Sequence, residues 1–259
     1  MMSTLRVFGD LFFPPCCVGC GKRLSPSLGK EKTPYFCSDC ARSWEKSLLS
    51  QCPDCFGAYC ECRCQPYAMK RAGSKGLIKL APYQKEGDHS AVCHAIHSMK
   101  RRPRKRVFDC CAHELSQPLL KAVAISEQKA SISRTVIVHL PRSVGKFRRY
   151  GFDQARELAR ALSRVTSYPY LNALRRVKKG VEQKKLTVKE RQENLKGAFA
   201  LKGDLCGCRV ILVDDVVTTG ASMSEAIKIL KQGGAAEILP VCVAASLKKH
   251  RTSAFPKFS

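Results

Sequence analysis

The stretch from Val210 to Ser224 places the strongest constraint on what this chain can fold into. It opens with four apolar, mostly β-branched residues, which predict a short buried strand of a parallel sheet. Asp214 and Asp215 follow this strand, and a helical pattern begins at Met223. The loop between the acids and the helix contains small and hydroxyl residues, namely Thr218, Thr219, Gly220, Ala221 and Ser222. Such a turn lets backbone N–H groups converge on an anion beside the positive end of a helix.

The two carboxylates indicate which anion the loop would bind. They repel a phosphate, but they can accept hydrogen bonds from two adjacent hydroxyls, and a ribose 5-phosphate offers both kinds of group. The stretch resembles the PRPP-binding motif of type I phosphoribosyltransferases, a hydrophobic strand followed by two acids and a T-T-G-x-[ST] loop. The alternative is a strand that ends in a solvated aspartate pair, followed by a threonine helix cap. The chain contains neither G-x-x-x-x-G-K-[ST] nor G-x-G-x-x-G.

Cysteine clustering predicts a metal-binding unit at the N-terminal end. Ten of the 16 cysteines lie between Cys16 and Cys64, and six of them form three C-x-x-C pairs. Two-residue gaps let both sulfurs of a pair reach one tetrahedral zinc. The apolar patch at residues 11–13 is shorter than the hydrophobic region of a signal peptide, and no apolar run is long enough to span a membrane. We therefore expect a cytoplasmic protein whose cysteines bind metal.

The spacing also suggests how the cysteines are shared between two ions. The first set is Cys17, Cys20, Cys37 and Cys40. The second takes Cys52, Cys55 and two of Cys60, Cys62 and Cys64, and we assign it Cys60 and Cys64. Cys16 is then the spare cysteine. So small a unit has little core of its own, so metal binding would stabilise its fold. The predicted organisation is a double zinc-ribbon module at 1–66 and an α/β domain at 67–259, which opens with a basic connecting segment to about residue 106.

The charge is unusually positive, with 46 Lys and Arg against 21 Asp and Glu and a net formal charge of +25. Such an excess predicts attraction to a polyanion, with nucleic acid favoured. Six of the seven residues from 100 to 106 are basic, and they form either a phosphate-facing patch or a solvated loop. The candidate DNA-binding residues are Lys100, Arg101, Arg102, Arg104, Lys105, Arg106 and, from a later loop, Arg149. His94 and His97 are read as the polar face of a helix rather than as metal ligands.

Two further segments of the second domain carry candidate binding residues. A β-branched strand at residues 135–140 is followed by a basic loop in which Arg142, Lys146 and Arg148 could bind a second anion, such as pyrophosphate. Residues 175–199 are highly charged and poor in core residues, which is typical of a mobile lid between two core strands. Its lid candidates are Gln183, Arg191 and Asn194.

The order of these motifs resembles the ComF family of competence proteins. After the cysteine module come Pro141 with Gly151-Phe152-Asp153-Gln154, then Gln183, Leu186, Arg191, Asn194, Gly197, Ala198 and Phe199, then the V-D-D-V-V-T-T-G-A-S run. The sequence departs from the family pattern at His139, Tyr150 and Gly180, where proline, arginine and threonine are usual. The resemblance implies a zinc-finger module fused to a type I phosphoribosyltransferase fold, a mostly parallel sheet flanked by helices.

The resemblance further implies a role in handling single-stranded DNA during natural transformation, with a competence helicase as partner. Two functions stay open from the sequence. In the first, the protein binds PRPP or a related ribose phosphate together with single-stranded DNA, through its phosphates and the basic loops. In the second, it is an active transferase that moves a phosphoribosyl group from PRPP to an unknown acceptor. Structural Zn²⁺ is expected in both, and Mg²⁺ would accompany PRPP.

Overall fold

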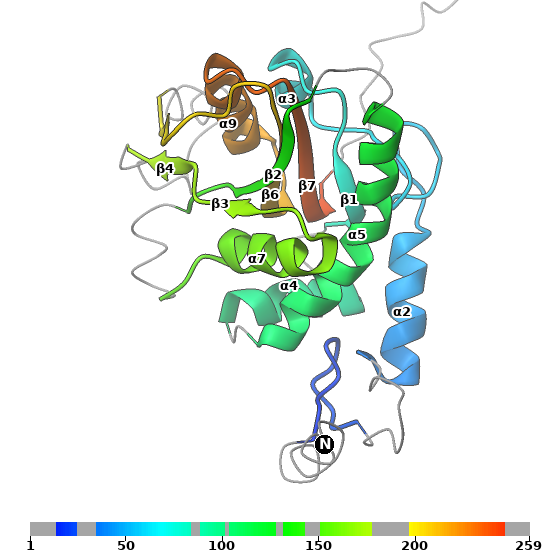
Figure 1. Ribbon diagram of the computed structural model, residues 1–259. Helices are drawn as coiled ribbons and strands as arrows, with labels where there is room; N and C mark the ends of the chain where they lie inside the picture. The colour runs from blue at the N-terminus through cyan, green and yellow to red at the C-terminus, as the bar shows by residue number, and fades with distance from the viewer. Residues whose placement is uncertain are drawn as a thin grey trace, which may run out of the picture.

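The computed structural model describes residues 14–24, 35–83, 89–101, 104–127, 132–142, 151–177 and 197–246. Figure 1 shows the helices and strands of these residues arranged around one central sheet. Along the chain they are α2 (Ser38–Leu48), α3 (Tyr67–Arg71), β1 (Ile78–Pro82), α4 (Ala91–Arg101), α5 (Lys105–Glu127), β2 (Arg134–His139), α7 (Gln154–Thr166), β3 (Tyr170–Leu171), β4 (Leu174–Arg176), β5 (Phe199–Leu201), β6 (Cys208–Val217), α9 (Ala221–Gln232) and β7 (Glu237–Ala245).

Among the described residues, five strands form a parallel sheet in the order β1-β7-β6-β2-β3. β6 lies at its centre, with Val210 in register with Val136 of β2 on one side and Ile238 of β7 on the other. Because the strands run in parallel, their carboxyl ends share one edge, where ligands of open α/β sheets bind. The sheet therefore places the residues after β6 between those after β2 and β7.

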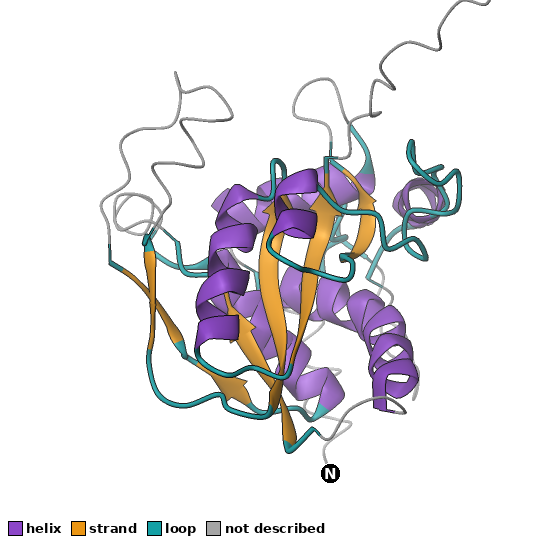
Figure 2. Ribbon diagram, turned by 90° about the horizontal axis from the view of Figure 1, so that it is seen from above, coloured by secondary structure: helices purple, strands orange, loops and turns teal. Residues whose placement is uncertain are grey.

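Helices cover both faces of the sheet, as the apolar character of β6 predicts (Figure 2). Ile211 and Val213 point to one core, which also contains buried residues of α4, α5 and α7. Val210 and Leu212 point to the other core, shared with α3, α9 and the β4–β5 ribbon. The predicted mostly parallel sheet flanked by helices is confirmed.

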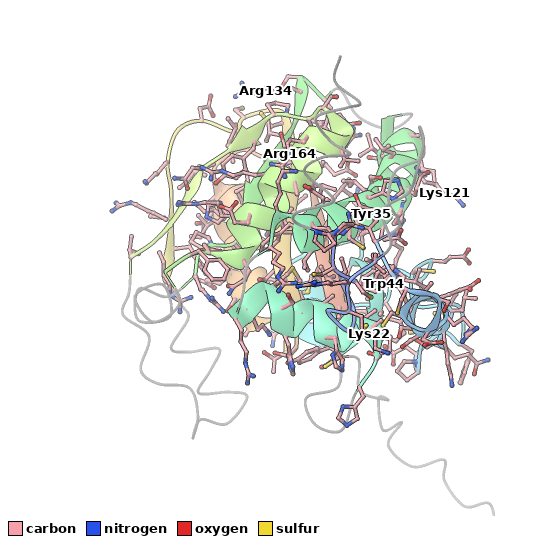
Figure 3. All side chains as sticks on the ribbon, turned by 90° about the horizontal axis from the view of Figure 1, so that it is seen from below. Lys22, Tyr35, Trp44, Lys121, Arg134 and Arg164 are labelled. Atoms are coloured by element: carbon pink, nitrogen blue, oxygen red, sulfur yellow. The ribbon has the colours of Figure 1, made fainter. Side chains whose placement is uncertain are left out.

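The cysteine-rich segment packs against this sheet domain. Val18 and Trp44 are buried in the same apolar cluster as α4 and α5, and Trp44 Nε1 donates to Glu114 of α5 at 3.3 Å. Tyr35 of this segment also packs against that cluster, and Figure 3 shows both residues beside the helices. The division at residues 66 and 67 remains a prediction, but the two parts share apolar core. No helix of the described residues is both long and apolar enough to cross a membrane.

Candidate functional site

The two aspartates lie at the carboxyl end of the central strand. Asp214 Oδ1 accepts from the backbone N–H of Asp215 at 2.8 Å, and Asp215 Oδ1 accepts from that of Val216 at 2.8 Å. Burial raises the pKa of Asp214 well above its usual range, and the neighbouring charge of Asp215 raises it further. Keeping two carboxyl groups this close costs electrostatic free energy. Such an arrangement is typical of a binding site.

The loop after the acids turns into α9 at Gly220. Gly220 has a φ of 72°, in the left-handed region that glycine adopts without strain. A Cβ at this position would come within 2.9 Å of Met69 Cγ and 3.0 Å of Pro66 Cβ. These two residues lie just before and within α3. The loop therefore packs against residues 66–69, the segment that follows the second group of cysteines.

The basic loop after β2 is closed at its base by one side chain. Asp153 Oδ2 accepts from the backbone N–H of Arg142 at 2.8 Å, and its Oδ1 accepts from that of Arg156 at 3.3 Å, which caps α7. Both ends of the loop are thus fixed beside the acid pair, because β2 neighbours β6. Three candidate residues in this loop, Lys146, Arg148 and Arg149, lie outside the described residues.

His139 lies at the end of β2 beneath this loop. It is buried, and its Nδ1 is 3.0 Å from the hydroxyl of Tyr170. Burial lowers the pKa of His139 to about 4, so the imidazole is neutral at neutral pH. This position therefore fills the core without adding a charge to the anion loop.

Lys100, one of the candidate DNA-binding residues, lies near the acid pair. Its Nζ is 4.0 Å from Asp215 Oδ2 and 5.3 Å from the centre of the Tyr83 ring. The sequence could not reveal this proximity, since the two residues are 115 positions apart and meet only through the sheet order. The site thus combines two acids with one cation that also faces an aromatic ring.

The lid candidates Gln183, Arg191 and Asn194 lie outside the described residues, but both ends of their segment are fixed. β4 and β5 pair antiparallel, and the N–H of Val177 donates to the carbonyl of Ala198 at 2.9 Å. The N–H of Gly197 donates to Glu225 Oε1 at 2.8 Å, one turn into α9. The charged segment therefore ends next to α9, and the β4–β5 pairing brings its start close to the same place.

Comparison with known proteins agrees with this geometry. A family model described as "Phosphoribosyl transferase domain" matches residues 148–258. Competence protein F of Haemophilus influenzae is 44% identical over 94 residues, which cover 35% of this chain and 41% of that protein. DNA utilization protein YhgH of Salmonella typhimurium is 27% identical over 215 residues, 82% of this chain and 90% of that protein. Competence protein ComFC of Streptococcus pneumoniae is 24% identical over 208 residues, 78% of this chain and 84% of that protein.

The names of these relatives and the domain match support the resemblance to the ComF family. The sheet domain has a phosphoribosyltransferase fold, which confirms the fold predicted from the motif order. Among solved structures, a purine phosphoribosyltransferase from Pyrococcus horikoshii is 23% identical, with a TM-score of 0.30 over 54% of this chain and 75% of that one. That superposition is too loose for a residue-by-residue comparison.

The N-terminal part of the chain brings eight of its cysteines into two groups of four. The sulfurs of each group lie within 4.8 Å of one another, so each group could hold a metal ion. The first group is the predicted one, Cys17, Cys20, Cys37 and Cys40. The second is Cys52, Cys55, Cys62 and Cys64, so Cys62 takes the place that we assigned to Cys60. The reason is the turn at residues 58–62, where the N–H of Cys62 bonds to the carbonyl of Ala58 and Cys62 is buried.

A buried lysine, which the sequence did not mark as functional, contacts the second group. Lys79 of β1 is 0% exposed, and its Nζ donates to Cys62 Sγ at 2.9 Å. It also donates to the carbonyl oxygens of Cys62 and Cys64, each at 3.0 Å, and lies 5.2 Å from the centre of the Tyr59 ring. The three ammonium hydrogens thus have three acceptors. One signal was available in the sequence, because Lys79 interrupts a short apolar strand.

The basic run at the end of α4 does not form one surface. Lys105 pairs with Asp109 of α5, and Lys100 lies near Asp215. Arg101, Arg104 and Arg106 instead line a pocket against the first cysteine turn. Arg102 lies outside the described residues.

Proposed function

We propose that this protein binds PRPP or a related ribose phosphate at the carboxyl edge of its sheet, and binds single-stranded DNA, in the service of DNA uptake. The observation that carries the first part is the acid pair at the end of β6, followed directly by the Gly220 turn and α9. Ribose hydroxyls would donate to Asp214 and Asp215. The 5-phosphate would lie against the N–H groups of residues 218–222 at the start of α9.

Lys100 and Arg142 supply positive charge on the two sides of this acid pair. Lys100 reaches it from the end of α4, and Arg142 begins the loop after the neighbouring strand. In this proposal they face the pyrophosphate of PRPP, together with Lys146 and Arg148. Mg²⁺ would enter with the pyrophosphate, since this ion usually binds through substrate phosphates and one or two carboxylates.

The net charge of the chain and the names of its relatives support single-stranded DNA as the second ligand. The net charge of +25 favours a polyanionic partner. The printed names of several relatives refer to competence or DNA utilization. We extend that role to this chain as part of the proposal, with the competence helicase implied by the family as a further partner.

The direct test is isothermal titration calorimetry of the full chain with PRPP and Mg²⁺, repeated in the presence of a short single-stranded oligonucleotide. We expect saturable binding of PRPP and separate saturable binding of the oligonucleotide. The comparison titration uses ribose 5-phosphate, which keeps the hydroxyls and the phosphate but lacks pyrophosphate. Absence of heat with both phosphoribosyl ligands would remove the ribose-phosphate assignment.

A second candidate function, phosphoribosyl transfer, is favoured by the intact acid pair. It would add release of pyrophosphate when an acceptor is present, which a coupled pyrophosphate assay detects. The described residues supply no side chain whose position assigns it as the base that would activate an acceptor. Binding is therefore the function proposed first.

We propose that structural zinc occupies both cysteine groups, because four thiolates at tetrahedral reach are the donor set that Zn²⁺ prefers. Changing Cys37 to serine removes a ligand of the first group only. Metal analysis is expected to show one zinc fewer per chain than the wild type. Changing the spare Cys16 to serine is the matched control and should leave the zinc content unchanged. Equal zinc in both variants would contradict the assignment of the first group.

A further inference from the structure

The basic residues after α4 border a pocket that the proposed phosphoribosyl site does not use. The pocket has a volume of about 550 Å³ and lies between the first cysteine hairpin and the helices α4 and α5. The hairpin contributes residues 14 and 16–21, and the helical side contributes His94, His97, Ser98, Arg101, Arg104, Arg106 and Val107. None of the described residues that line it is acidic. The pocket therefore has a strongly positive wall facing the cysteine turn.

The helical wall is a continuous stripe of polar residues on one face of α4. His94, His97, Ser98 and Arg101 are spaced at i, i+3, i+4 and i+7, so they lie along the same face. The opposite face of α4, with Val92, Ala95, Ile96 and Met99, is buried in the core. Because the core fixes that apolar face, it also fixes the direction in which the polar stripe points.

Arginine side chains complete the wall at the junction of α4 and α5. Arg106 stacks against the ring of Tyr35, with its guanidinium carbon 5.1 Å from the ring centre. Arg101 and Arg104 are exposed around the pocket rim. A guanidinium offers a planar fork of donors that fits phosphate oxygens, and it keeps its charge at any physiological pH.

The opposite wall is the turn that carries two of the four thiols in the first group. Cys17 Sγ accepts from the backbone N–H of Cys37 at 3.3 Å, and the N–H of Val18 donates to the carbonyl of Tyr35 at 2.9 Å. These contacts hold the hairpin against the segment that leads into α2. The shape of the pocket thus depends on the cysteine group being assembled.

We propose that this pocket binds phosphodiester groups of a single-stranded nucleic acid, and this inference rests on the DNA-binding part of the proposed function. Three arginines and two imidazoles surround a space larger than one phosphate, which leaves room for part of the adjoining nucleotide. None of the described residues that line the pocket is a Phe, Tyr or Trp, so we expect binding to be mainly electrostatic rather than by base stacking and to depend little on sequence. The cysteine module thereby contributes one wall of the DNA site.

The experiment compares two variants that each remove two positive charges. Arg101→Ala with Arg104→Ala removes the two exposed arginine side chains from the rim of the pocket. Lys46→Ala with Lys121→Ala is the matched control, since both lysines are exposed outside the pocket, and Lys121 projects from the far part of α5, away from Lys22 of the hairpin (Figure 3). Fluorescence anisotropy with a labelled thymidine oligonucleotide measures affinity at several salt concentrations.

The pocket variant is expected to bind the oligonucleotide on the order of tenfold to a hundredfold more weakly at low salt, because two charge-assisted contacts are lost. The slope of log K against log salt should fall by about 1.4, since each phosphate contact on a single strand contributes about 0.7. The control should keep the wild-type slope and lose less than about threefold in affinity. Arg101→Lys with Arg104→Lys keeps the charge and should keep most of the slope.

Equal losses in the pocket variant and the control would overturn the pocket and leave the proposed DNA binding standing. A wild-type protein that binds no oligonucleotide at any salt would overturn both. The comparison is repeated with 5′-phosphorylated and 5′-hydroxyl oligonucleotides. Dependence on Arg101 and Arg104 for the phosphorylated end alone would show a terminal-phosphate site and would overturn the strand assignment.

Zinc content and the melting temperature confirm that each variant is folded. If the double alanine variant fails this check, Ser98→Glu is the second probe, because it puts a carboxylate on the same wall. It is expected to weaken oligonucleotide binding, and unchanged affinity in this variant would overturn the inference.

Discussion

Changing Asp214 and Asp215 together to asparagine is expected to weaken PRPP binding by at least about a hundredfold while the protein keeps its fold. Each carboxylate that accepts a ribose hydroxyl makes a charge-assisted hydrogen bond worth about 1.5–3 kcal/mol, and losing two removes more than a factor of ten each. Calorimetry with PRPP and Mg²⁺ measures the loss. Asp39→Asn with Asp204→Asn removes two negative charges at exposed positions and should leave the affinity within about threefold.

Stability should move in the opposite direction in the single variant Asp214→Asn. Burial beside Asp215 raises the pKa of Asp214 in the folded protein above its value in the unfolded chain. The folded state therefore holds this proton more tightly, and it loses stability as the pH rises from the unfolded pKa through the folded pKa. At neutral pH asparagine removes that cost, and the free energy of unfolding should rise by about 0.5–2 kcal/mol.

Thermal melting at several pH values measures this difference. It should be present at neutral pH and should vanish at acidic pH, below about 4, where Asp214 is protonated in both states. A variant that is less stable than the wild type at neutral pH, or that binds PRPP as tightly, would show that these acids are held for packing. Together the two results separate a binding role from a structural one.

Changing the buried Lys79 to methionine is expected to cause a large loss of stability. Methionine fills a similar volume, but it leaves Cys62 Sγ and the carbonyls of Cys62 and Cys64 without their buried donor. Breaking a buried charged interaction by removing one partner costs about 3–5 kcal/mol. The melting temperature should fall by roughly 10 °C.

The same variant should hold metal in the second cysteine group less firmly. Groups that hydrogen-bond to metal ligands commonly change metal affinity by about 10–100-fold. Metal release to a chromogenic chelator is therefore expected to be faster, whereas Lys70→Met, at an exposed position of α3, should release metal and melt like the wild type. Wild-type melting and release in Lys79→Met would mean that the Nζ contacts contribute nothing.

Local patterns in the sequence predicted the centre of the site. The apolar run of β6, the two acids and the small residues before α9 are contiguous, so their order alone specifies strand, turn and helix. The apolar residues Leu158, Ala161, Leu162 and Val165 have helical spacing, which predicts α7 from local sequence, and Asp153 caps that helix. The first cysteine group was predicted because each C-x-x-C pair forms a turn on its own.

What the sequence could not predict depends on partners that are distant along the chain. Lys79 looked like one of several scattered lysines, because its acceptors at Cys62 and Cys64 come close only when β1 joins the sheet. Lys100 looked like part of a uniform basic run, yet neighbouring side chains on a helix point in different directions, so Lys100 and Arg101 reach different sites. The choice of Cys62 over Cys60 likewise follows from a turn whose direction spacing does not specify.

The contacts between α3 and the loop before α9 couple the second cysteine group energetically to the proposed ribose-phosphate site. Ser224 Oγ donates to the carbonyl of Ala68 at 2.9 Å, and Met69 and Pro66 lie against Gly220, only a few residues after Cys64. A metal ion that orders the second cysteine group would therefore also order residues 66–69, which pack against the proposed ribose-phosphate loop. By reciprocity, a ligand that orders the loop would raise the affinity of the second cysteine group for metal, and loss of the metal would lower the affinity for the ligand by the same factor. Zinc supply would then set how much phosphoribosyl ligand the protein retains, without any metal in the ligand site itself.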